Sequence, residues 1–365
     1  MRIQCTRGGL SDFWSIVQGV VPAKPTRPIL ANIKVVADKN GLELQATDLD
    51  IGIRLRVKDA EVVEEGSAVV PAALLGSLLR DSWSEKVEIY TEENLVHVIM
   101  QNSKFKIHGD DPEHFPELPN FNEENLFSIP KASFLQMARL TAFATAQEDT
   151  RYALNGVLLS VKGKNACMVA TDGRRLSYAK CKIAIAAKKD VNAIIHTKGL
   201  AEIERALRED DDAVNIAVDD NRLFSKSKTA TVFTKLIEGT FPNYDEVIPT
   251  DNNKQATIKR EELLAGLRQS AKMTSEESRA VRMLFEKDKL TLSSSSPESG
   301  DATIEVPVQY GGDAFEIRFN PSFLTDVLRA IAVEEINMEF KEKSSPGLVR
   351  VGKDFVYVVM PINIE

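Results

Sequence analysis

The chain has 365 residues, of which 43% are hydrophobic and 27% are charged, so it is long enough for two or three domains and has the composition of an ordinary globular protein. Its formal net charge of −8 argues against a nucleic-acid binder in general, although it does not exclude a basic face on an acidic body. Three cysteines without a CxxC pair, no signal peptide and no apolar run near the ~20 residues that span a bilayer predict a reduced, cytoplasmic protein without membrane contact.

The first part of the chain predicts two helices among strands. In chain order, these are a strand at 2–6, a helix at 10–17, a proline-broken exposed loop that contains Lys24 and Arg27, a strand at 51–58, a helix at 74–79, and a last strand through Phe105 and Ile107. The alternation of apolar and polar residues over 51–58 is typical of a strand with one buried and one wet face. Phe115-Pro116 closes this part.

The same order of predicted elements occurs twice more, with Phe241-Pro242 echoing Phe115-Pro116. Three sets of anchor residues recur in the same order: Ile3, Ile129 and Ile258 before the first helix, Ala46, Ala170 and Ser294 in the middle strands, and Leu75, Leu200 and Leu324 in the second helix. The middle set recurs every 124 residues, and the last set after 125 and 124. This recurrence predicts three copies of one unit.

A period this long is that of a domain, not of a solenoid repeat. We therefore expect three tandem α+β domains at 1–124, 125–251 and 252–365, each with about two helices on a mostly antiparallel sheet.

No group of residues predicts a catalytic or metal site. The four histidines, among them His97 and His196, are scattered, and His97 lies in an alternating strand where we expect it to face solvent. Neither a phosphate-binding loop nor a dinucleotide-binding glycine motif is present. Asp210-Asp211-Asp212 follows a helix, which favours a solvated turn over a cation site. We expect no cofactor.

Basic residues are more informative once they are placed on the helices. Those in or next to the first helices are Lys131, Arg139, Arg260, Arg268 and Lys272, and those in or next to the second helices are Arg80, Lys198, Arg205, Arg208 and Arg329. Any one of them could equally belong to an ordinary solvated face. Their recurrence in three copies favours a positive surface that attracts phosphates without reading bases.

The whole chain resembles the bacterial DNA polymerase III beta subunit, the sliding clamp. The resemblance is carried by Arg151-Tyr152 with Leu154-Asn155-Gly156, Ala170-Thr171-Asp172-Gly173 with Arg175-Leu176, Phe241-Pro242, and Tyr357-Val358-Val359-Met360-Pro361. It implies a head-to-tail homodimer that closes into a six-domain ring, encircles double-stranded DNA without sequence specificity, and tethers the polymerase. It also implies loading by a separate ATP-driven loader.

The resemblance further implies an apolar pocket between the second and third domains that binds short hydrophobic motifs of the polymerase and clamp-loader subunits. Its walls would be Leu154, Thr171, Gly173, Arg175, Leu176, Pro242, Val247, Val358, Val359, Met360 and Pro361. A core strand is the alternative for Val358 and Val359, and we expect one of the two to be core. Met360, with its unbranched side chain, is the expected gate.

Two departures from the family pattern make the rim of this pocket more acidic. Glu246 stands where some family members have an arginine, and the chain ends in Asn363-Ile364-Glu365 where they often have a basic residue and a leucine. We expect partners with more basic flanks.

The resemblance also suggests DNA contacts and a dimer interface. The DNA-binding residues would be Lys24, Arg151, Tyr152, Lys198 and Arg205, and the dimer interface would contain Phe105 and Ile107 of the first domain against Met273 of the third. Charged substitutions at Ile107 and Met273 together are expected to give monomers.

Two other functions compete with a clamp. A three-domain peptide-binding adaptor that never encloses DNA would also suit an acidic chain with an apolar pocket. A hydrolase or transferase using Asp172 and His196 is the third hypothesis, and no supporting constellation of residues favours it.

Overall fold

The computed structural model describes residues 1–93, 95–121, 125–147, 152–183, 186–219, 221–274 and 280–362. They form two compact units. Unit 1 contains Met1–Phe134 and Ile183–Ile237, and unit 2 contains Leu135–Lys182 and Glu238–Glu365. The second predicted copy therefore contributes to both units.

One order of elements occurs three times: a strand, a helix, a run of strands, a second helix and three last strands. The first copy contains β1 (Arg2–Thr6), α1 (Arg7–Gln18), β2 (Asn32–Asp38), β3 (Gly41–Thr47), β4 (Ile51–Val57), β5 (Glu61–Glu64), β6 (Gly66–Pro71), α2 (Ala72–Asp81), β7 (Lys86–Glu92), β8 (Leu95–Met100) and β9 (Ser103–His108).

The second copy contains β10 (Phe127–Pro130), α3 (Lys131–Thr141), β11 (Gly156–Lys162), β12 (Asn165–Thr171), β13 (Arg175–Lys182), β14 (Val191–His196), α4 (Thr197–Ala206), β15 (Ala213–Val218), β16 (Arg222–Lys226) and β17 (Ala230–Lys235). The third contains β18 (Lys254–Lys259), α5 (Arg260–Ser270), β19 (Val281–Glu286), β20 (Lys289–Ser296), β21 (Gly300–Gln309), β22 (Phe315–Phe319), α6 (Pro321–Ala330), β23 (Glu335–Phe340), β24 (Gly347–Val351) and β25 (Phe355–Val359). The predicted α+β class with three tandem copies is confirmed, while the domain boundaries at 124 and 251 stay predictions.

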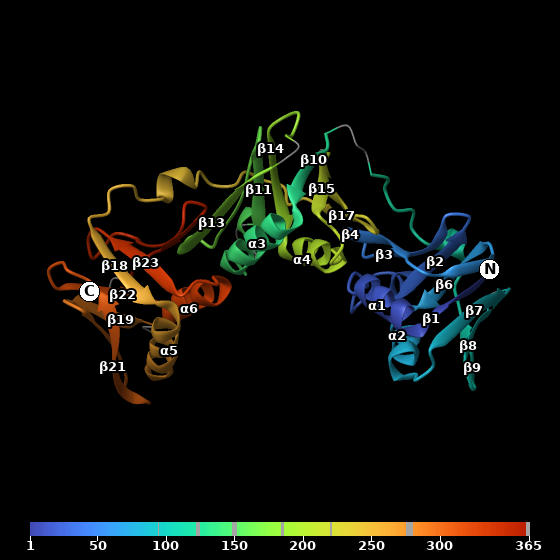
Figure 1. Cartoon of the computed structure of the whole chain (residues 1–365), viewed down its shortest axis with the longest axis horizontal. Helices are drawn as coiled ribbons and strands as arrows, with labels where there is room; N and C mark the ends of the chain where they lie inside the picture. The colour runs from blue at the N-terminus through green and yellow to red at the C-terminus, as the bar shows by residue number, and fades with distance from the viewer. Residues whose placement is uncertain are drawn as a thin grey trace. The chain divides into compact units, whose positions relative to one another are not determined.

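In unit 1, two antiparallel sheets carry the fold. One has the strand order β5-β1-β7-β8-β9, and the other has the order β10-β15-β16-β17-β4-β3-β2-β6. β17 pairs with β4 from Ala230↔Leu55 to Thr234↔Ile51, so strands of the first and second copies form one continuous sheet. Helices α1 and α2 pack against each other, and the Trp14 indole, fully buried, donates to the Ala72 carbonyl (2.9 Å) (Figure 1).

In unit 2, the strands follow the order β11-β12-β13-β25-β24-β23-β18-β21-β20-β19-β22. β13 pairs with β25 from Arg175↔Val359 to Ala179↔Phe355, which is the same joint that β4 makes with β17. Helices α5 and α6 pack against each other (Figure 1). Their core contains the aromatic rings of Phe285, Phe319 and Phe340, all fully buried.

A cation at the first position of the first helix recurs in each copy and binds backbone carbonyls in the last turn of the second helix or in the loop that follows it. Arg7 donates to the carbonyls of Leu79 and Ser84 (both 3.2 Å). Lys131 donates to those of Arg208 and Glu209 (both 2.8 Å). Arg260 does the same for α6, through Leu328 and Val333 (both 3.0 Å). The last carbonyls of a helix lack intrahelical partners and carry partial negative charge, so a cation stabilises them.

This arrangement corrects the expectation for two residues of the predicted positive surface. Lys131 and Arg260 are partly buried at helix ends, where carbonyl oxygens bind their charged groups. Their charged groups bind the backbone and do not belong to an exposed positive surface. By contrast, Arg80, Arg139, Arg268 and Arg329 are exposed on their helices, as expected.

His97 is not a surface residue, contrary to the expectation from its alternating strand. It is only 6% exposed, because the ring of Tyr90 on the paired strand covers it at a centroid distance of 4.6 Å. Its Nε2 lies 3.2 Å from a carboxylate oxygen of Glu92. Both faces of β8 are covered, so the alternation of apolar and polar residues did not indicate which side chains face solvent.

Asp211 is likewise not part of a solvated turn. Its buried carboxylate accepts from the backbone N–H groups of Arg208 (2.7 Å) and Lys228 (2.9 Å). Its neighbour Asp210 pairs with Lys58 at 2.6 Å. Asp212 pairs with Lys228 at 3.0 Å, so contacts of all three aspartates hold the loop after α4 in place.

Candidate functional site

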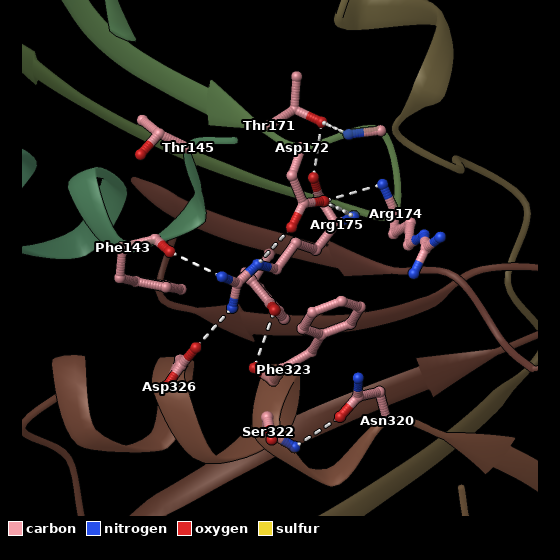
Figure 2. Close-up of polar contacts among 12 residues, drawn as sticks. Phe143, Thr145, Thr171, Asp172, Arg174, Arg175, Asn320, Ser322, Phe323 and Asp326 are labelled. Carbon is pink, nitrogen blue, oxygen red and sulfur yellow. Dashed lines mark hydrogen bonds and ion pairs between the residues drawn. The ribbon is translucent and has the colours of Figure 1, made fainter. Parts of the chain in front are cut away.

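The turn between β12 and β13 begins the site. The Thr171 hydroxyl donates to the Arg175 carbonyl (2.6 Å) and accepts from the Gly173 N–H (3.1 Å), while Gly173 takes φ +85°, which a glycine adopts without strain (Figure 2). The first copy has the same turn, in which the Thr47 hydroxyl bonds to Ile51 (2.8 Å) and Leu49 (2.9 Å). The turn is thus a feature of the repeat.

Asp172 holds this turn closed. One carboxylate oxygen accepts from the N–H groups of Arg174 (2.9 Å) and Arg175 (3.0 Å), and the other accepts from the Arg175 Nε (3.0 Å). His196, its partner in the enzyme hypothesis, accepts from the Lys198 N–H (3.1 Å) at the start of α4. Both residues therefore have structural roles at their own turns.

Arg175 ties the turn to two further elements. Its side chain is 10% exposed and binds Asp326 of α6 (2.7 Å) and the Phe143 carbonyl (2.8 Å), with its guanidinium over the Phe323 ring at 4.6 Å (Figure 2). Burial lowers the pKa of Arg175, but the hydrogen bond to Asp326 and nearby negative charge raise it overall, so the group stays charged. Charge-assisted bonds of this kind fix the position of the turn.

A cavity of about 170 Å³ opens beside this turn. Its walls are Leu154, Thr171, Gly173, Arg174, Arg175, Leu176, Pro242, Tyr244, Val247, Val358 and Met360. The structure thus brings together every predicted wall residue except Val359 and Pro361. Sequence reasoning missed Arg174 and Tyr244, which stand next to predicted wall residues in the turn and after Pro242.

Val359 does not line the cavity because successive side chains of a strand point to opposite faces. Val358 and Val359 are both buried in β25, and Val359 is the one that belongs to the core alone, as expected for one of the two. Only Val358 reaches the cavity wall. Pro361 lies beyond Met360 and is likewise not a wall residue.

The cavity has a buried apolar floor and a partly open apolar mouth. Leu154, Leu176 and Val358 are buried, whereas Val247 is 45% and Met360 40% exposed. The Met360 N–H donates to the Arg174 carbonyl (2.8 Å), which fixes the backbone at the mouth while the thioether remains free to repack. Exposed apolar side chains around a concave apolar site are typical of a surface that binds a partner.

Beyond the mouth, Tyr244 contacts Tyr178 of β13 and Cys167 of β12. The two rings are tilted with centroids 5.8 Å apart, and the Cys167 Sγ lies 3.7 Å from the Tyr244 hydroxyl. Burial raises the pKa of Cys167 and that of Tyr178, the latter to about 12. These groups are therefore neutral near pH 7, and the thiol is a poor nucleophile.

At the equivalent joint of β4 with β17 in unit 1, Phe233 pairs with Gly52, where the joint in unit 2 pairs Val358 with Leu176. The Phe233 ring lies against Gly52, where a Cβ would overlap it, and packs with Phe224 at a centroid distance of 6.2 Å. Phe121 and Leu118 complete this cluster. The residue equivalent to Phe233 at the joint in unit 2 is the smaller Val358.

The predicted DNA-binding residues are placed as follows. Lys24 is exposed in the loop after α1. Lys198 is exposed on α4 and pairs with Asp48 at 2.6 Å. Arg151 lies outside the described residues, and the Tyr152 side chain is not described.

Arg205 is held in a defined place on α4. Its guanidinium pairs with the buried Glu202 carboxylate (3.0 Å) and lies against Gly19 at the C-terminal end of α1, where a Cβ would overlap it. The negative end of the α1 dipole favours a cation there.

The predicted dimer residues lie on β9 and next to α5. Ile107 is buried, at 4% exposure, within its own sheet, and Phe105 is half-buried. β9 is an edge strand in unit 1. Met273 is half-buried in the short 3₁₀ turn Ala271–Met273.

The described residues contain no gathering of three or more His, Cys, Asp or Glu side chains that could hold a metal ion. None of the helices in this part of the chain is both long and apolar enough to cross a membrane.

Comparison with protein families gives three matches that follow one another along the chain. Residues 1–119 match the N-terminal domain, residues 128–243 the central domain, and residues 245–363 the C-terminal domain of the DNA polymerase III beta subunit.

Relatives and solved structures agree with these matches over the full length. The beta sliding clamps of Pseudomonas aeruginosa and Chlamydia muridarum are 32% and 30% identical to the chain, with 100% of both chains covered in each case. A structure of the P. aeruginosa sliding clamp bound to griselimycin has a TM-score of 0.93 at 31% identity, again covering 100% of both chains.

Proposed function

The chain belongs to the family of DNA polymerase III beta subunits, the sliding clamps, and from this membership we propose which of its residues perform each task of a clamp. It is a non-catalytic processivity factor, a homodimeric ring that encircles duplex DNA and tethers the polymerase and its clamp loader. The assignment of residues that follows is supported by their positions and exposure.

The apolar cavity at the joint of β13 with β25 is the proposed docking pocket for short hydrophobic segments of partners. This assignment rests on the cavity's combination of a rigid floor and an adaptable mouth. Asp326 and Asp172 fix Arg175 beneath the turn, while Met360 and Val247 remain exposed at the opening. A partner's leucine or phenylalanine anchor would gain affinity by filling such a cavity.

Most of the proposed DNA surface consists of exposed cations on helices and in the loop after α1, and Arg151 and Tyr152 are assigned to it from the family resemblance alone. Besides Lys24, Arg151, Tyr152, Lys198 and Arg205, it includes Arg80 and Arg329, which occupy the position of Arg205 in α2 and α6. Repetition of one arginine in three copies gives an array of charges without base specificity, which is suited to sliding.

The proposed dimer contact joins β9 of one chain to β21 of the other. In both joints within the chain, the third strand after the first helix pairs with a last strand: β4 with β17, and β13 with β25. β21 is the third strand after the first helix of the third copy, and β9 is the last strand of the first copy. These two strands are the ones that remain for a joint between chains. β9 is an edge strand with Lys104 and Lys106, and β21 carries Asp301 and Glu305, so their charges are complementary.

Electron microscopy and light scattering of the purified chain test this assignment. A ring of two chains with an open hole is expected. An elongated monomer would contradict it and would favour an adaptor that does not enclose DNA. A cytoplasmic location is also part of the proposal, since a polymerase subunit acts where the bacterial chromosome is replicated.

A further inference from the structure

The charges beside the docking pocket are unevenly placed. The 3₁₀ turn η5 (Asp245–Val247) begins directly after one wall residue, Tyr244, and ends at another, Val247. Between them, Asp245 and Glu246 are exposed and form what we name the acidic rim. Arg174, another wall residue, is also exposed and carries the opposite charge.

The second arginine of the pocket does not offset the acidic rim. Arg175 is already paired with two carboxylates, those of Asp172 and Asp326. Within the described residues no ion pair joins Asp245 or Glu246 to a cation, and Glu246 only accepts from the side-chain amide of Asn243 (2.7 Å). The rim charges therefore remain available to a bound molecule.

The aromatic surface next to the rim suits a cationic side chain. Tyr178 and Tyr244 are half-buried, and burial, followed by the charges of Cys167, Asp245 and Asp354, raises the pKa of Tyr178. Lys162 is the nearby opposing cation, since its charge lowers the pKa of Cys167. An aromatic face beside carboxylates attracts lysine and arginine.

Resting on the proposed docking role of the pocket, we propose that the segment which binds there carries a lysine or arginine beside its apolar anchors, and that the acidic rim selects it. The apolar anchors would fill the cavity, and the basic residue would lie over Tyr244 against Asp245 and Glu246. Arg174 would face the other end of the segment, which gives the bound segment a preferred direction.

The expected effect is modest because the rim is exposed to solvent. An exposed ion pair changes an equilibrium by roughly 1.5- to 5-fold, so two rim carboxylates should alter affinity by about 2- to 25-fold at low salt. Salt should shrink the effect, because exposed charges are screened over about 10 Å at 0.1 M ionic strength.

The test measures, by fluorescence anisotropy, the affinity of the full-length protein for three peptides. They share one short apolar clamp-binding core and differ only in a flank of Lys-Lys, Gln-Gln or Glu-Glu. The wild-type protein should bind them in that order of decreasing affinity. The double variant Asp245→Asn with Glu246→Gln should bring the three affinities together, mainly by weakening the Lys-Lys peptide.

The matched control is Glu61→Gln with Glu65→Gln, which removes the same charge from exposed positions in unit 1 and should keep the wild-type order. If the Gln-Gln peptide binds but all three affinities are equal, the rim does not select and the inference fails while the pocket stands. Tighter binding of Glu-Glu would also overturn it, in favour of Arg174. If no peptide binds, the docking role itself fails.

Discussion

At the scale of single residues, the DNA surface depends on how its cations are held. Arg205 lies against Gly19 and is paired with Glu202, so its position is set by a neighbouring helix end and by a buried carboxylate. A glycine is required at position 19 for space alone, since its φ of −59° suits any residue.

Replacing Gly19 with alanine should displace the Arg205 guanidinium without straining the backbone. We expect affinity for short duplex DNA to fall by roughly 2-fold and the slope of log affinity against log salt to decrease by up to about 1, because one phosphate contact is weakened. Gly8→Ala is the control, since a Cβ at Gly8 meets open space. Equal salt slopes for both variants would remove Arg205 from the DNA surface.

Glu202 should make stability depend on pH. Burial raises its pKa above the ordinary value of 4.5, although Arg205 and Lys198 oppose the shift. A carboxyl whose pKa is raised by folding contributes stability below its unfolded pKa, and this contribution is lost as pH rises through the folded pKa. In urea unfolding from pH 4.5 upward, Glu202→Gln should therefore gain stability relative to wild type as pH rises. Parallel curves for the two proteins would contradict this.

At the scale of elements, the helix pair α1–α2 and the helix pair α5–α6 are each joined by one cation. Arg7 binds the Leu79 carbonyl of α2 and Arg260 binds the Leu328 carbonyl of α6, so neither helix pair can separate without leaving these groups unsatisfied. Hydrogen-bond geometry, and not only apolar packing, thus fixes the arrangement of each pair.

Removing one of these cations should cost stability. For Arg260→Ala we expect a loss of about 1.5–3 kcal/mol in the free energy of unfolding, the range for hydrogen bonds to charged groups. Arg268→Ala, which removes an exposed arginine of the same helix, should change it by less than about 0.5 kcal/mol. Urea denaturation of both variants compares them directly, and equal losses would show that Arg260 has no special role.

The elements and their threefold order could be predicted from the sequence because spacing and periodicity repeat every copy. Burial and charge pairing could not. His97 and Asp211 lie in sequence patterns that are typical of solvent-exposed residues. In the structure, the ring of Tyr90 covers His97, and two backbone N–H groups bind the Asp211 carboxylate. The pocket walls followed from a family pattern, but Tyr244 and Arg174 became visible only once the chain was folded.

At the scale of the whole molecule, ring closure depends on the proposed contact of β9 with β21. Ile107 is buried within its own chain, so a charge there would unfold the sheet before it tested the interface. Phe105 and Met273 are half-buried and are better positions.

We expect Phe105→Asp together with Met273→Asp to convert the dimer to folded monomers. Light scattering measures the mass, and circular dichroism with thermal melting checks that each chain is still folded. The control is Val63→Asp, which places a charge at an exposed apolar position on another strand. A folded double variant with unchanged dimer mass would place the interface elsewhere.

The packing of the joint in unit 1 limits how many partners one ring can bind at a time. Val358 borders the proposed docking pocket in unit 2, whereas Phe233 lies over Gly52 at the equivalent joint in unit 1, so we place one docking pocket in each chain. With one docking pocket proposed in each chain, a polymerase and a repair enzyme must either occupy the two pockets of a dimer together or bind in turn. The number of docking pockets in a ring thereby limits which proteins can act together on the encircled DNA.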